Sequence, residues 1–154
     1  MFNFILFLHS LMRWAVLISL LTSIGLAYIG YSKRRTFSKT DNAWRHWTAT
    51  VAHVQLIIGM LVYTQSSTAK FSFRQISFLG HIKPEFFFGV VHLLMMLIAI
   101  VLVTIGSAMA KRKPNDYEKF KTMLIWFSLA LLIILLAIPW PFSPLAQRPY
   151  LHTL

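Results

Sequence analysis

The chain has 154 residues, of which 57% are hydrophobic and only 12% are charged, whereas soluble domains carry about 25% charged residues. This composition excludes an ordinary soluble protein, and the absence of cysteine excludes disulfides, thiolate metal sites and thiol redox relays. The net charge of +11 does not indicate nucleic-acid binding, because the basic residues cluster between apolar runs, as topology signals of membrane proteins do.

Four apolar runs follow one another along the chain, and each is long enough to cross a bilayer. We therefore predict one all-α domain over residues 1–154, an integral membrane bundle of four helices that run alternately up and down. The expected spans lie at residues 4–31, 46–64, 85–110 and 120–138. No basic segment precedes the first run, so we predict a retained helix rather than a cleaved signal peptide.

The polar segments between the runs predict the orientation of the chain. Residues 32–45 and residues 111–121 each contain five Lys or Arg side chains. Basic links are retained on the cytoplasmic side of the bacterial inner membrane, so we expect both links in the cytoplasm and both termini outside. The connection over residues 65–84 mixes Phe with Lys and Arg, and we expect it to lie on the outer membrane surface.

Three histidines, His9, His53 and His92, lie within three different apolar runs. An ionisable side chain inside a membrane is costly and marks a functional site by default. Neutral imidazole is a ligand of haem iron and of transition metals, and the core of a four-helix bundle is where such cofactors are held. The simpler interpretation is that a neighbouring helix hydrogen-bonds each ring. The three rings together favour a cofactor or metal site formed by His9, His53 and His92.

Depth along the helices separates the two pairings that could bind one metal ion. With a rise of about 1.5 Å per residue, His9 and His92 lie roughly 10 Å from the outer ends of their spans, and His53 lies roughly 16 Å from its outer end. Axial ligands of one iron need similar depths, which favours His9 with His92 on diagonal helices. The pair His53 with His92 requires tilt, which membrane helices often have, and it stays open.

Arg13 lies one helical turn from His9 on the same face. Its guanidinium could bind a haem propionate, a quinone carbonyl or Glu85. The alternative is that the side chain extends to the membrane interface, as long basic side chains do.

The motifs around these histidines resemble a known group of proteins. They are LHSLMRW at residues 8–14, HVQL at residues 53–56, and the set Glu85, His92 and Met96. The chain is similar to the small four-span proteins labelled cytochrome b-like and, more distantly, to other b-type four-helix membrane cytochromes. This resemblance covers the first three spans, about two-thirds of the chain. It implies non-covalent haem b between helices and electron exchange with quinone or a partner. The fourth span has no histidine, so the resemblance supports at most one haem.

The leading hypothesis is therefore a small b-type cytochrome-like protein of the inner membrane. His9 and His92 would be the axial pair, His53 the alternate ligand or a quinone-site residue, and Arg13 the partner of a propionate or a quinone. The rival hypothesis is a subunit or assembly factor of a larger membrane complex, without its own cofactor. The expected partners are the lipid bilayer, quinone, and other membrane subunits or a second copy of the chain.

Overall fold

The structure is a computed structural model, and it describes residues 1–66 and 86–140 apart from the side chain of Phe87. All regular elements in these ranges are helices: α1 Phe2–Ser32, α2 Lys39–Gln65, the π-helix η2 Phe87–Val91, α4 His92–Arg112 and α5 Asp116–Ala137. Four helical segments are long and apolar enough to cross a membrane, with η2 and α4 forming one of them. The prediction of four long apolar helices is confirmed. Except for Gln65 and Ser66 at the end of α2, the expected surface segment at residues 65–84 lies outside the described residues, as do Glu85 and the chain beyond residue 140.

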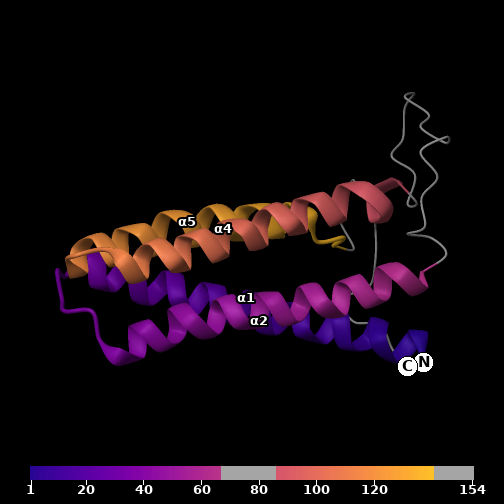
Figure 1. Cartoon of the computed structure of the whole chain (residues 1–154), viewed down its shortest axis with the longest axis horizontal. Coiled ribbons are helices and arrows are strands. Elements are labelled where there is room, and N and C mark those ends of the chain that lie inside the picture. The colour runs from indigo at the N-terminus through magenta and orange to yellow at the C-terminus, as the bar shows by residue number, and fades with distance from the viewer. Residues whose placement is uncertain (67–85, 141–154) are drawn as a thin grey trace.

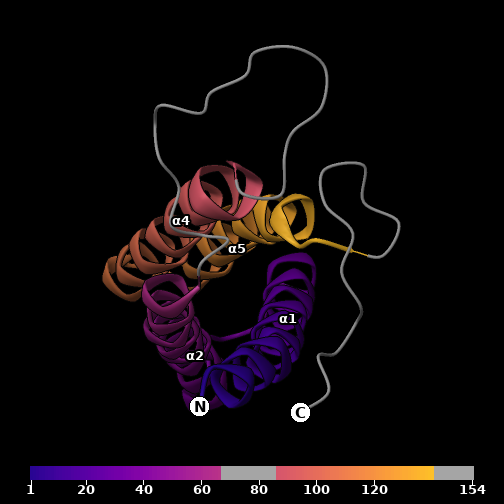
Figure 2. The same cartoon turned by 90° about the vertical axis from the view of Figure 1, so that its right-hand side faces the viewer.

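The four helices form a bundle in which each helix packs against its neighbours in chain order. α1 contacts α2 and α5, and α4 contacts α5 and α2, so α1 and α4 lie diagonally across the bundle. Figure 1 shows the antiparallel pairs α1–α2 and α4–α5, and Figure 2 shows the four helices end-on. This order agrees with the up-and-down connectivity expected from the short links.

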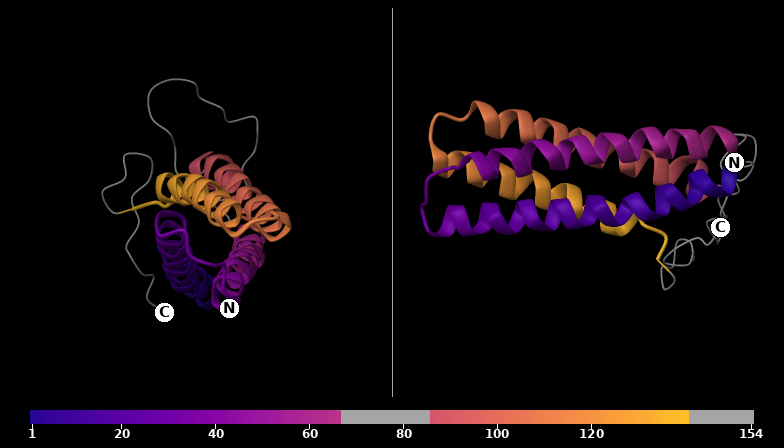
Figure 3. Two further views of the ribbon diagram at one scale, coloured as in Figure 1. Left: turned by 90° about the vertical axis from the view of Figure 1, so that its left-hand side faces the viewer. Right: turned by 90° about the horizontal axis from the view of Figure 1, so that it is seen from below.

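Residues 33–38 and residues 113–115 connect the helices of the two pairs, and both connections lie at one end of the bundle (Figure 3). Because the basic side chains flank these connections, we call this the basic end. The N-terminus of α1 lies at the opposite end. The two Lys/Arg clusters found in the sequence therefore share one end of the fold.

The second helix begins at Lys39, earlier than the expected start at residue 46. Ser38 accepts a hydrogen bond from the Asp41 backbone N–H, and the Asp41 carboxylate accepts one from the Ser38 N–H, which forms a capping box. Arg35, in the link, donates two hydrogen bonds of 2.6 Å to the buried Asp41 carboxylate. These hydrogen bonds raise the pKa of Arg35 above its usual value. The polar pattern of the link therefore continues into the first two turns of α2.

Arg45 lies inside the bundle rather than in a solvated link. Only 5% of the residue is exposed, and its guanidinium donates to the Ser107 carbonyl oxygen at 2.9 Å and to the Ser107 hydroxyl. The Asn42 side-chain oxygen accepts two further hydrogen bonds from it. These contacts join α2 to α4 near the basic end.

Close helix contacts at the basic end depend on glycine. A Cβ atom at Gly30 of α1 would overlap the ring of Phe120 of α5, which is fully buried. A Cβ atom at Gly106 of α4 would overlap Cβ of Trp126. In α1, the Ser23 hydroxyl lies 2.7 Å from the Thr48 hydroxyl of α2. The bundle is therefore tightly packed in the half next to the basic end.

We predict that Gly30→Ala lowers stability by about 1–3 kcal/mol, the usual cost of overpacking a core. Gly25→Ala on the same helix is the control, because no atom lies within 4 Å of a Cβ at that position. That change should stabilise α1 by about 0.5–1 kcal/mol through helix propensity. The stability of both variants in detergent is measured by monitoring their unfolding with circular dichroism. Equal effects of the two variants would contradict the packing at Phe120.

Candidate functional site

A cavity of about 510 Å³ lies between the helices in the half of the bundle away from the basic end. This volume falls in the range of about 300–1,000 Å³ that small-molecule and cofactor sites occupy. α1, α2 and α4 supply most of the wall, and α5 contributes only near its C-terminal end. The polar side chains of the wall on α1, α2 and α4 include His9, Ser10, Arg13, Gln55, Tyr63 and His92.

His9 of α1 and His92 of α4 both line this cavity, and their rings lie edge to face. Their ring centroids are 6.4 Å apart, and the ring planes are inclined at 74°. The diagonal placement of α1 and α4 and the similar depth of the two residues bring the rings together. The structure thus places the depth-matched pair at one site.

The end of α5 orients the imidazole of His92. Its Nδ1 lies 2.8 Å from the Ala137 carbonyl oxygen, so Nδ1 carries the proton and donates. In a continuing helix, the carbonyls of Leu135 and Ala137 would accept from residues 139 and 141, but both are prolines without an amide N–H. The Leu135 carbonyl accepts instead from the indole N–H of Trp140 at 2.9 Å. Two prolines therefore leave a backbone acceptor for His92.

The π-helix Phe87–Val91 ends directly before His92. Short π-helical turns inside α-helices are rare and are frequent at functional sites. A π-turn adds a residue to the turn, so it changes the direction of the side chains on either side of it. Here the π-turn changes the direction of the His92 side chain relative to the side chains that precede it.

α2 holds His9 from the opposite side. A Cβ atom at Gly59 would lie 3.1 Å from His9 Cε1 and 3.5 Å from His9 Nδ1, so a side chain at this position would crowd the ring. One turn earlier, Gln55 donates to the backbone carbonyl of His9 at 3.0 Å. The buried Nδ1 of His9 and the buried Oε1 of Gln55 have no hydrogen-bond partner among the described residues. Each of these two buried atoms therefore has hydrogen-bonding capacity that the described residues do not use.

Arg13 extends over two tryptophans at the edge of the cavity. Its guanidinium carbon lies 5.6 Å from the ring centroid of Trp14 and 6.0 Å from that of Trp140. Both distances are within the range of cation–π attraction. The described residues that line the cavity include no Asp or Glu. Among the described lining residues, the cavity therefore brings one cationic side chain together with two imidazoles.

His53 does not join the other two histidines. The residue is exposed on the outer face of α2, and its Nδ1 donates to the Ala49 carbonyl at 2.6 Å. Its Nε2 lies 3.3 Å from the hydroxyl of Thr104 on α4. Both ring nitrogens have protein partners, and His53 does not line the cavity. The structure therefore separates His53 from the pair His9 and His92.

Sequence reasoning missed three contributors to this site. Gln55 lies two residues after His53 and so on another face of α2, and this face, rather than that of His53, lines the cavity. Gly59 and the carbonyl of Ala137 gave no sequence signal that links them to a histidine far away in the chain. The Pro139 and Pro141 pair was a signal for the free carbonyl at Ala137, although it does not say which donor uses it.

The distance between the rings of His9 and His92 can be compared with the distance that two imidazoles have when they bind one metal ion. Two imidazoles on opposite sides of one metal ion, with metal–nitrogen distances near 2.0–2.1 Å, hold their ring centres roughly 6 to 6.5 Å apart. The observed 6.4 Å lies in this range. Within residues 1–66 and 86–140, no group of three or more His, Asp or Glu side chains could hold a metal ion. The same separation is ordinary for two rings in edge-to-face contact.

In comparisons with protein-family models, curated proteins and solved structures, no match was found.

We predict that the proton of His92 resides on Nδ1 at alkaline pH, where free imidazole is neutral. Nitrogen NMR of the protein labelled with ¹⁵N-histidine, in detergent, distinguishes a protonated from an unprotonated ring nitrogen. His92→Gln identifies the signal by its loss. A protonated Nε2 and an unprotonated Nδ1 in His92 would contradict the hydrogen bond to Ala137.

Proposed function

We propose that this protein is a small b-type cytochrome-like protein that binds one haem b in the cavity, with His9 and His92 as axial ligands. Electrons would pass to or from quinone or a partner protein. The observation that carries the proposal is a pair of imidazoles, with ring centroids 6.4 Å apart, that together line one cavity of about 510 Å³. When bound, haem iron supplies one-electron redox chemistry, which none of the side chains of the cavity provides.

The surroundings of both rings suit ligation. His92 donates Nδ1–H to a backbone carbonyl, the usual arrangement by which a protein fixes the tautomer of a metal-binding histidine and leaves Nε2 for the metal. His9 has room beside Gly59. His9 Nδ1 and Gln55 Oε1 are both buried without a hydrogen-bond partner among the described residues, and a hydrogen bond between them would give each histidine an acceptor of its own. Gln55 is then a positioning residue for His9.

Arg13 is the residue that we assign to a propionate of the haem. A guanidinium binds carboxylate through parallel charge-assisted hydrogen bonds, and burial strengthens this attraction. Trp14 and Trp140 hold the cation at the edge of the cavity.

We place the protein in the bacterial inner membrane, with the basic end in the cytoplasm and the N- and C-termini outside. Four helices have the length and composition of membrane spans. Both Lys/Arg clusters lie at the same end of the bundle, and an excess of positive charge is retained on the cytoplasmic side. The cavity with His9 and His92 then lies in the outer half of the bundle.

His92→Ala should abolish the Soret band of protein purified from haem-replete cells, because it removes a haem ligand together with the hydrogen bond that joins this residue to the Ala137 carbonyl of α5. His9→Ala should do the same or leave a weak, high-spin spectrum. The matched control is His53→Ala, which removes an imidazole outside the cavity and should leave the spectrum unchanged. Oxidised and reduced optical spectra measure all three variants.

No Soret band in the wild-type protein would reject the proposal. The chain would then be better explained as a subunit or assembly factor of a larger complex, and stoichiometric partners in mild detergent would support that role. Loss of haem in His53→Ala, with retention in His9→Ala, would reject the assigned ligand pair and leave the fold unaffected.

The orientation can be tested with single cysteines, because the chain contains none. Asn3 and Thr36 are both exposed and lie at opposite ends of the bundle. A membrane-impermeant maleimide should label Asn3→Cys in cells with a permeabilised outer membrane, and it should label Thr36→Cys only after lysis. The reverse pattern would place the basic end outside.

A further inference from the structure

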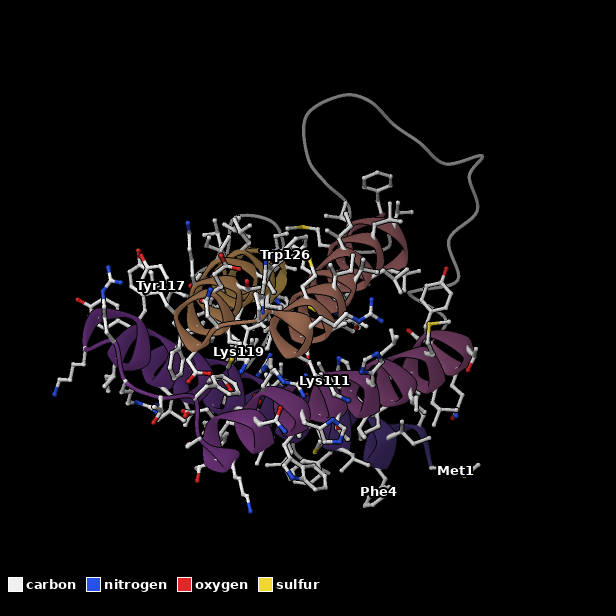
Figure 4. All side chains as sticks on the ribbon, turned by 60° about the vertical axis from the view of Figure 1, so that its left-hand side comes forward. Met1, Phe4, Lys111, Tyr117, Lys119 and Trp126 are labelled. Atoms are coloured by element: carbon white, nitrogen blue, oxygen red, sulfur yellow. The ribbon has the colours of Figure 1, made fainter. Side chains whose placement is uncertain are left out.

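A second cavity, of about 280 Å³, lies at the basic end where the two helix pairs meet. It is lined by Phe37 and Ser38 of the first link, Lys39 and Asn42 of α2, Lys111 of α4 and Lys119 of α5. Figure 4 labels Lys111 and Lys119 at this end of the bundle, away from Met1 and Phe4. Side chains from three helices therefore converge on a site that the haem proposal does not use.

The oxygen acceptors of the side chains in this cavity are already occupied. The Asn42 side-chain oxygen accepts two hydrogen bonds from Arg45, which turns the amide N–H₂ group away from Arg45. The Ser38 hydroxyl donates to the Asp41 carboxylate and accepts from the Asp41 backbone N–H. The polar groups that remain for a ligand are the three ammonium groups and the Asn42 N–H₂, and all of them are donors.

The nearby carboxylates do not neutralise the site. Asp41 is buried and bound by Arg35 at 2.6 Å through both oxygens. Asp116 lies 2.9 Å from the Lys119 ammonium and offsets that charge. Lys39 and Lys111 form no ion pair within the described part of the chain. A net positive charge, with donors only, is complementary to an anion.

We propose that this cavity binds a phosphate group at the basic end of the bundle. Lysine ammonium groups bind phosphate as point charges, and basic pockets between helices on the cytoplasmic side of a membrane bind lipid headgroups. Lys39 is the first residue of α2, where the helix dipole also favours an anion. The phosphate belongs to an anionic lipid headgroup or to free phosphate, and the same donors would hold either.

The test uses the full-length protein in a neutral detergent and three variants. The pocket variant combines Lys39→Gln, Lys111→Gln and Lys119→Gln. The control variant combines Lys33→Gln, Arg112→Gln and Lys121→Gln, which removes the same charge from exposed positions outside the cavity. The third variant, Asn42→Asp, keeps an oxygen acceptor for Arg45 and replaces the amide donors with a carboxylate oxygen. Circular dichroism verifies that all three retain the helical fold.

Binding of phosphatidylglycerol and of phosphatidylcholine is measured by native mass spectrometry, and inorganic phosphate is added as a competitor. We expect the pocket variant and Asn42→Asp to weaken phosphatidylglycerol binding by about tenfold or more, since a single basic contact near an anionic lipid contributes roughly fivefold. The control variant should change it by less than about twofold. If inorganic phosphate competes with phosphatidylglycerol, the ligand is free phosphate. If it does not compete and phosphatidylcholine binds only weakly, the ligand is the anionic lipid.

Equal losses in the pocket and control variants would show only general attraction to a basic surface and would overturn the proposal. Wild-type binding of both phosphatidylglycerol and inorganic phosphate by the pocket variant would overturn it too. Neither outcome bears on the haem site, which lies at the other half of the bundle.

Discussion

The early end of α5 is the constraint on which the cavity depends. α5 stops at Ala137, whereas α1 and α2 continue to the end of the bundle that is opposite the basic end. Pro139 and Pro141 cannot supply amide hydrogens, so continuing the helix would leave carbonyl groups without partners. Ending it leaves three helices around a space that four would fill with side chains. The same ending presents the Ala137 carbonyl to His92. The missing amide hydrogens of Pro139 and Pro141 thus account for both the early end of α5 beside the cavity and the orientation of the His92 ring that lines it.

The arrangement of the helices could be predicted from the sequence because it depends on features that are local in the chain. Apolar runs of sufficient length predict helices, and short links predict antiparallel neighbours. If the helices also follow one another around the bundle in chain order, the first and third spans lie on a diagonal, and the structure has this order. Equal depth along diagonal helices then brings His9 and His92 to the same level, and the structure places their rings 6.4 Å apart. Helix ends were less accurate: α2 starts at Lys39 because of a capping box whose polar residues also suit a link.

The rest of the site could not be predicted, because it depends on which face of each helix turns inward. His53 and Gln55 are two residues apart and differ by about 200° around the helix. Either could have faced the core, and periodicity in a helix that is apolar on most sides does not decide between them. The structure turns Gln55 inward and leaves His53 against Thr104. The role of Gly59 is likewise visible only once His9 lies beside it.

The buried Arg45 has a consequence for the order in which the chain assembles. Its main acceptors on another helix belong to Ser107, and α4 is synthesised well after α2. Until α4 arrives, the guanidinium has only Asn42 on its own helix. α2 is also the least hydrophobic of the four candidate spans. A nascent α1–α2 hairpin would therefore carry a guanidinium without its acceptors on α4, and docking of α4 onto α2 would complete its hydrogen bonds at a late step of assembly. Truncated chains that end before residue 107 should accordingly be prone to degradation.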